Sequence, residues 1–231
     1  MNKPIYEYSR NYYSEKGEDG IVAEIIAHLG ITSGLLLECG AWDGYHCSNT
    51  AHIWSNNRNF NAILVEAERI RLNAQPLEDR NPNVEAVCQY VGREWPLHDV
   101  VERSRFSKDE FVLASIDIDG DDMGAWKSLN GYEPIILIVE WNGCVYSSRN
   151  PHGVTASKWH EELEKLGNYC FIGTSGFLGE EPGNMFFIRK DYKDKFPVTK
   201  EDWRDRGIIT IKGALYDRHK LHWDHESCPD D

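Results

Sequence analysis

The feature that most constrains this chain is a series of short apolar runs that alternate with stretches of helical periodicity. The clearest runs read LLLE, AILVE, FVLASIDID and IILIVE. Continuous aliphatic strands, each followed by a helix, are typical of a mostly parallel sheet that helices cover on both faces. We predict strands over residues 35–38, 62–66, 84–91, 111–119, 135–140, 169–173 and 185–189, and helices over residues 17–29, 48–55, 69–79, 97–103, 122–129 and 156–166.

The last two predicted strands differ from the others. A short loop rich in glycine, TSGFLGEEPGN, joins them without a helix, so the final strand should run antiparallel to its neighbours. The predicted fold class is therefore α/β: a Rossmann-like, doubly wound, seven-stranded sheet, mostly parallel with an antiparallel last strand. We expect a single domain over residues 1–231, with an N-terminal helical extension (1–30) and a polar C-terminal segment (197–231).

Charge and composition exclude several classes of function. The formal net charge of −13 opposes binding to a phosphate backbone, so we expect no nucleic-acid partner. No apolar run approaches the ~20 residues that span a bilayer, and the N-terminus lacks a signal-peptide pattern, so we expect no membrane association and a cytoplasmic protein. The six cysteines are scattered without a paired motif, which indicates reduced structural thiols rather than disulfides.

Carboxylates gather where the predicted strands end. In an open parallel sheet, ligands bind beyond the carboxyl ends of the strands, near the point where the strand order reverses. Carboxylates that meet at this edge repel one another unless donors or a cation accompany them, so their clustering indicates a site. The acids at these positions are Glu38, Glu66, Asp117, Asp119 and Glu140.

The stretch GLLLECGAWDG adds a turn with an unusual composition after the first of these strands. Gly40 and Gly44 flank Trp42 and Asp43, whereas a simple reversal of the chain needs only one glycine. Two glycines at this spacing indicate a backbone that stays open to a ligand. We therefore interpret the turn as the floor of a cofactor site.

With this turn and the acids at the strand ends, the sequence resembles the class I S-adenosylmethionine-dependent methyltransferases, and within them the FkbM-like O-methyltransferases. The first motif of that superfamily reads acid-x-G-x-G-x-G; Glu38, Gly40 and Gly44 fit it, while Trp42 stands in place of the middle glycine. The resemblance covers roughly residues 8–190. The segments that carry it are EKGEDGIVAEI, LLLECGAWDGYHCSNT, AILVEAE, LASIDIDGDDMGAWKSL and IILIVEWN.

The resemblance implies S-adenosylmethionine as cofactor. Glu66, at the end of the second strand, would accept hydrogen bonds from both ribose hydroxyls, and residues 88–91 would line the adenine. A nicotinamide dinucleotide is the competing cofactor, but the GxGxxG motif is absent. The implied cofactor residues are Glu38, Gly40, Ala41, Trp42, Asp43, Gly44, Glu66, Ala67, Gln89, Tyr90 and Asp117.

The acceptor of the methyl group would be a hydroxyl of a sugar, a glycan or a small metabolite. Asp119, Glu140 and Asn142 supply hard oxygen ligands suited to Mg²⁺ or another divalent cation, which would lower the pKa of that hydroxyl. Alternatively Asp119 or Glu140 acts directly as the base, and His152, in a long loop, is a further candidate base. Asp121 and Asp122 fit helix capping instead.

Two interpretations remain open for several features of the sequence. Lys16, Glu18 and Asp19 either pack across the cofactor or begin an ordinary helix. The polar C-terminal segment (197–231) either binds a transition metal or is solvated. The protein is either an enzyme or a non-catalytic binding or interaction module. For an enzyme, a homodimer is one expected arrangement. The metal-ligating residue types of the tail are His219, His222, Asp224, His225 and Cys228.

Overall fold

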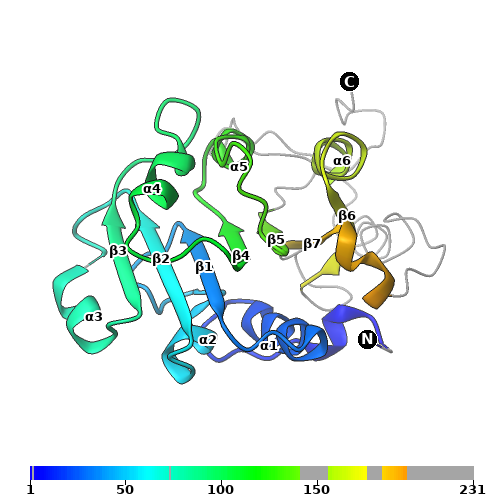
Figure 1. Ribbon diagram of the computed structural model, residues 1–231, viewed down its shortest axis with the longest axis horizontal. Coiled ribbons are helices and arrows are strands. Elements are labelled where there is room, and N and C mark those ends of the chain that lie inside the picture. The colour runs from blue at the N-terminus through cyan, green and yellow to red at the C-terminus, as the bar shows by residue number, and fades with distance from the viewer. Residues whose placement is uncertain (2, 73, 141–155, 176–183, 197–231) are drawn as a thin grey trace, which may run out of the picture.

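A computed structural model of the chain describes residues 1, 3–72, 74–140, 156–175 and 184–196. Within them the seven predicted strands form one sheet in the order β3-β2-β1-β4-β5-β7-β6 (Figure 1). β7 runs antiparallel to both of its neighbours, β5 and β6, as predicted. The strands are β1 (Gly34–Cys39), β2 (Phe60–Glu66), β3 (Val84–Cys88), β4 (Phe111–Ile116), β5 (Ile136–Val139), β6 (Tyr169–Thr174) and β7 (Met185–Arg189).

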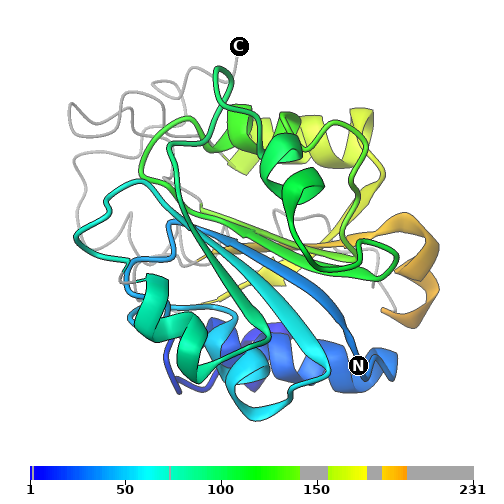
Figure 2. The ribbon, with the colours of Figure 1, turned by 60° about the vertical axis from the view of Figure 1, so that its left-hand side comes forward.

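Helices cover both faces of this sheet. Figure 2 shows α1, α2 and α3 on one side and α4, α5 and α6 on the other. The helical segments are η1 (Ile5–Tyr8), α1 (Glu18–Leu29), α2 (Ala51–Asn56), α3 (Ala74–Arg80), α4 (Leu97–Arg103), α5 (Asp122–Lys127), α6 (Ala156–His160), the π-helical turn η2 (Glu161–Leu166) and η3 (Lys190–Lys195). The doubly wound α/β prediction is confirmed.

The alternation of side chains along β1 explains the two layers. Leu36 points into the core shared with α1 and α2, whereas Leu35 and Leu37 point into the core shared with α4 and α5. All three are at most 1% exposed, because a central parallel strand is covered on both faces. Glu38 continues this alternation and therefore points toward α1 and α2.

The strand order reverses between β1 and β4, which are parallel neighbours. β1 leads by way of α2 to β2 on one side, and β4 leads by way of α5 to β5 on the other. The loops that follow β1 and β4 therefore diverge at the carboxyl edge of the sheet. An open α/β sheet binds its ligands at such a point.

Some predicted bounds were wrong. β4 ends at Ile116, not at residue 119, because the N–H of Ile118 donates to Asp122 Oδ1 instead of to a neighbouring strand. Asp117 and Asp119, which the prediction placed inside the strand, therefore lie in the loop that follows it. β3 ends at Cys88, which leaves Gln89 and Tyr90 in a loop.

Two helices begin later than predicted: α2 at Ala51 and α3 at Ala74. The segment before α2 is held by side-chain hydrogen bonds to Glu38 instead of by helical ones. Within the described parts of the chain, none of the helices combines the length and apolar character that crossing a membrane requires.

Candidate functional site

The turn after β1 lies against the loop that follows β4. Gly40 has a φ of 82°, and a Cβ atom at this position would lie 1.7 Å from the carbonyl oxygen of Asp117. Only glycine permits so close an approach of the two backbones. Gly44 has a φ of 90°, and a Cβ atom there would lie 2.9 Å from a methyl carbon at the flexible end of Leu77. Close backbone packing therefore requires glycine at Gly40, whereas at Gly44 the left-handed backbone is the main constraint.

Trp42 occupies the middle glycine position of the motif and keeps a glycine-like backbone. Its φ of 48° lies in the left-handed region, which residues with a side chain rarely adopt. Its backbone N–H donates to Glu66 Oε2 at 3.0 Å. Trp42 therefore combines an indole side chain with a backbone conformation that glycine adopts readily.

Glu66 joins the loops after β1 and β2. It is 7% exposed, and its second carboxylate oxygen, Oε1, accepts a hydrogen bond from the N–H of Glu68 at 2.9 Å. Each oxygen thus has one hydrogen-bond donor among the described residues, and a carboxylate oxygen offers about two acceptor positions. The remaining capacity suits a pair of hydroxyl donors, which is the arrangement that the ribose of a nucleoside presents.

Glu38, which the resemblance implies as a cofactor residue, accepts hydrogen bonds from the segment that leads into α2. Its carboxylate is 4% exposed and accepts hydrogen bonds from Ser48 Oγ at 2.6 Å, from the N–H of Asn49 at 2.7 Å and from the hydroxyl of Thr50. Burial raises its pKa, although these donors act in the opposite direction. The structure assigns Glu38 to holding the segment that leads into α2.

The other predicted cofactor residues surround the same loops. Ala41 is buried, and its N–H donates to the carbonyl of Val65 at 3.0 Å. Asp43 is exposed, and its Oδ1 accepts from the N–H groups of Tyr45 and His46, so it stabilises the turn. Ala67 follows Glu66 and is half-buried.

The predicted adenine segment begins where β3 ends. The N–H of Gln89 donates to the carbonyl of Glu66 at 3.0 Å, so Gln89 lies beside the end of β2. Its Oε1 accepts from the guanidinium of Arg103. Tyr90 is 64% exposed and its ring lies 6.3 Å from that of Trp95. These two aromatic rings therefore border the same edge of the sheet as Glu66.

Three carboxylates converge after β4 and β5. Asp117, Asp119 and Glu140 each place one oxygen within 4.8 Å of the others. Burial, followed by the negative charges of Glu140 and Asp122, raises the pKa of Asp117 well above its usual range. Asp119 is exposed with a left-handed φ of 52°, so this loop, like the turn at Trp42, holds a strained residue at the edge of the sheet. The sequence predicted this convergence correctly.

Asp122 is the ionisable group whose role sequence reasoning missed. Capping was predicted for Asp121 and Asp122, and Asp121 does cap α5 by accepting from the N–H of Gly124 at 3.0 Å. Asp122 is instead 1% exposed and ties the loop after β4 through the N–H of Ile118. Burial raises the pKa of Asp122 to about 7. An aspartate followed by a helix has a capping pattern, so no sequence signal separated the two.

The N-terminal motif has a structural role at the same edge. Asp19 is fully buried and accepts hydrogen bonds from the N–H groups of Tyr12 and Tyr13 and from Ser14 Oγ. Glu18 accepts from the N–H of Lys16 at 2.8 Å and from Ser175 Oγ, just beyond β6. These contacts fasten the N-terminal segment to the rim of the site. They exceed what an ordinary helix start requires.

Several predicted residues lie outside the described part of the chain. Asn142, predicted as a metal ligand, and His152, predicted as a base, belong to residues 141–155. The histidine-rich tail belongs to residues 197–231. Their roles stay predictions.

Comparison with solved structures identifies the fold of the chain. No family model and no curated protein sequence matches the chain. Among solved structures, the carbon methyltransferase of CurJ matches 80% of the chain with a TM-score of 0.52 and 12% identity. The carbon methyltransferase of DszA matches 80% of the chain with a TM-score of 0.51 and 14% identity. The chain has the Rossmann-like methyltransferase fold.

This methyltransferase fold is shared at low sequence identity. The chain spans 57% of the length of each of these two carbon methyltransferases. Because one fold carries many activities, the likeness establishes the architecture, and the reaction has to be argued from the residues of the site.

Proposed function

We propose that the protein is an S-adenosylmethionine-dependent methyltransferase that acts on a hydroxyl group of a sugar, a glycan or a small metabolite. The observation that carries the proposal is Glu66. It is a buried carboxylate at the end of the second strand, with acceptor capacity left and the glycine turn directly above it. Two ribose hydroxyls match that capacity.

The residues at the strand reversal point suit the remainder of this cofactor. The turn after β1 contacts the loop after β4 at Gly40 and Asp117, so a ligand that is bound at Glu66 and lies over this turn would extend toward Asp117 and Asp119. When bound, S-adenosylmethionine supplies a methyl group on a positively charged sulfur. A carboxylate near that sulfur would stabilise its charge, and the positive charge would in turn favour the ionised form of Asp117.

The acidic group after β4 and β5 supports the acceptor side of the reaction. Transfer of the methyl group to an oxygen requires alignment of the hydroxyl and removal of its proton. In this proposal Asp119 and Glu140 either accept that proton or hold a divalent cation that lowers the pKa of the hydroxyl. Oxygen atoms within 4.8 Å of one another fit the ligand shell of Mg²⁺ or Ca²⁺.

Isothermal titration calorimetry tests the cofactor assignment. Wild-type protein should bind S-adenosylmethionine and S-adenosylhomocysteine, and Glu66→Ala should weaken binding of both by more than tenfold, because two charge-assisted hydrogen bonds are lost. Glu110→Gln is a matched control, since Glu110 precedes β4 at the opposite edge of the sheet. No binding by the wild type at millimolar cofactor, or unchanged binding by Glu66→Ala, would refute the proposal.

Methyl transfer itself is tested separately with tritiated cofactor and a panel of sugars, glycans and small alcohols, with Mg²⁺ or with a chelator. Transfer that the chelator abolishes would support the cation, whereas transfer that persists would support a carboxylate base. Cofactor binding without transfer to any acceptor would favour the alternative of a non-catalytic binding module. The observation that supports this alternative is Trp42, which stands where the methyltransferase motif has its middle glycine.

A further inference from the structure

The side chain of Trp42 has no counterpart in a glycine turn, and it is not part of the core. It is 43% exposed, and the guanidinium carbon of Arg71 lies 4.2 Å from the centre of its ring. Arg71 is held in turn by Glu68, with 3.1 Å between Arg71 Nε and Glu68 Oε2. We name the stacked pair the Trp42–Arg71 clip. It joins the loop after β1 to the loop after β2.

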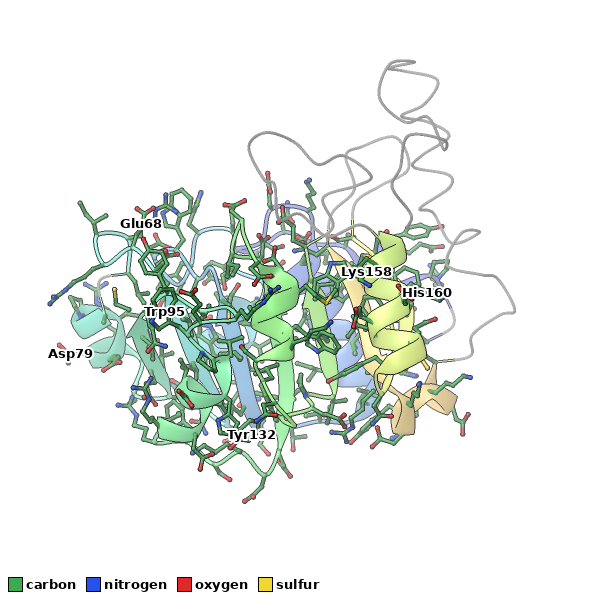
Figure 3. All side chains as sticks on the ribbon, turned by 90° about the horizontal axis from the view of Figure 1, so that it is seen from above. Glu68, Asp79, Trp95, Tyr132, Lys158 and His160 are labelled. Carbon is green, nitrogen blue, oxygen red and sulfur yellow. The ribbon has the colours of Figure 1, made fainter. Side chains whose placement is uncertain are left out.

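The same two loops are joined a second time by Glu66. One oxygen of its carboxylate accepts from the N–H of Trp42, and the other accepts from the N–H of Glu68. The ring of Trp42 therefore belongs to the residue whose backbone contacts the buried carboxylate. Figure 3 shows Glu68 on one side of the molecule, far from Lys158 and His160 of α6 on the other, so the clip borders the β2 side of the sheet.

The backbone of Trp42 indicates that this ring has a role beyond joining loops. Glycine adopts a φ of 48° without steric cost, whereas an L-residue with a Cβ atom does not. Strained residues at a ligand-binding edge are a recognised sign of a functional constraint. A half-exposed indole beside a ribose-binding carboxylate offers an apolar face to a nucleoside, which a glycine cannot.

We propose that the Trp42–Arg71 clip is a nucleoside-binding element: the indole covers the ribose and adenine side of the cofactor held at Glu66, and Arg71 positions the indole. The inference rests on the proposed function. It adds a cofactor contact that a glycine turn lacks. It also explains how the site tolerates an indole where the methyltransferase motif has glycine.

Calorimetry with S-adenosylhomocysteine on four variants tests the clip. Trp42→Ala should weaken binding about tenfold, the scale of a lost aromatic stacking contact, whereas Trp42→Phe should stay within about threefold. Arg71→Gln should weaken binding about threefold, since the cation no longer holds the ring. The matched control is Arg69→Gln, which removes the same charge from an exposed position in the same loop and should change binding less than twofold.

Trp42→Gly separates a binding role from a purely structural one. Glycine relieves the left-handed strain, so the melting temperature should stay within about 2 °C of the wild type or rise, while binding falls as in Trp42→Ala. If the clip only holds the loops together, Trp42→Gly and Trp42→Ala should both have a lower melting temperature and bind S-adenosylhomocysteine as the wild type does. That result would overturn the inference.

Tryptophan fluorescence gives a second readout. The change in emission on adding S-adenosylhomocysteine should be largest for the wild type and mostly lost in Trp42→Phe, although calorimetry still detects binding. An equal change in both proteins would show that the nucleoside does not cover Trp42, and would overturn the inference while leaving the proposed function intact. Absence of binding by the wild type would refute the proposed function first, and the clip with it.

Discussion

Replacing Asp122 by asparagine should make the protein more stable at alkaline pH. Asp122 is 1% exposed and its pKa is raised to about 7, first by burial and then by the charges of Glu140 and Asp119. Within the described part of the chain, its Oδ2 has no hydrogen-bond partner. An ionised carboxylate in this position is costly, because the side chain is buried and its Oδ2 has no donor among the described residues.

The size of the effect follows from the difference in pKa between the folded and unfolded states. The ordinary value is 3.8 and the folded value is about 7. Each pKa unit is worth about 1.4 kcal/mol, so ionisation of Asp122 costs the folded state of the order of 4 kcal/mol. Because the folded pKa is the higher one, the stability of the folded protein with a neutral Asp122 is fully present below pH 3.8. It is lost progressively as the pH rises through about 7, where Asp122 ionises in the folded state.

The Asp122→Asn substitution would keep an acceptor for the N–H of Ile118 and remove the charge. Urea unfolding followed by circular dichroism should therefore give free energies of unfolding for wild type and Asp122→Asn that differ by about 1 kcal/mol near pH 4.5, and a variant more stable by about 2 to 4 kcal/mol at pH 8.5. The matched control is Asp121→Asn, whose profile should parallel that of the wild type. A difference between Asp122→Asn and wild type that does not grow with pH would refute the reasoning.

Three further substitutions test the loops around the site. Gly40→Ala should destabilise the protein by more than about 3 kcal/mol in thermal unfolding, because its Cβ atom would meet the carbonyl of Asp117, whereas Gly131→Ala, also left-handed but with open space, should cost about 1 kcal/mol. Glu38→Gln should cost about 1 to 3 kcal/mol in urea, since its carboxylate accepts from three donors. Asp19→Ala should speed tryptic cleavage before α1, and an unchanged rate would contradict its role as acceptor for that segment.

Local pattern was sufficient for most of the fold because each element depends on neighbours in sequence. The apolar run Leu35–Leu37 has no period-2 polarity, which only a strand covered on both faces explains. The helix α1 ends at Leu29, as its predicted range has it, and Gly30 follows with a left-handed φ of 69°. The acids after β2, β4 and β5 were also found from sequence, since parallel strands bring their carboxyl ends to one edge.

Hydrophobic periodicity and loop length were sufficient to predict the succession of strands and helices along the chain, the antiparallel final strand and the edge at which the acids meet. Four features became visible only in the folded chain: β4 stops at Ile116, Glu38 supports α2, Asp122 is buried rather than capping, and Trp42 stacks on Arg71. Each of these depends on a contact between segments that the sequence pattern does not pair. Burial, donors and charge around a side chain come from the folded chain as a whole, and they set its role.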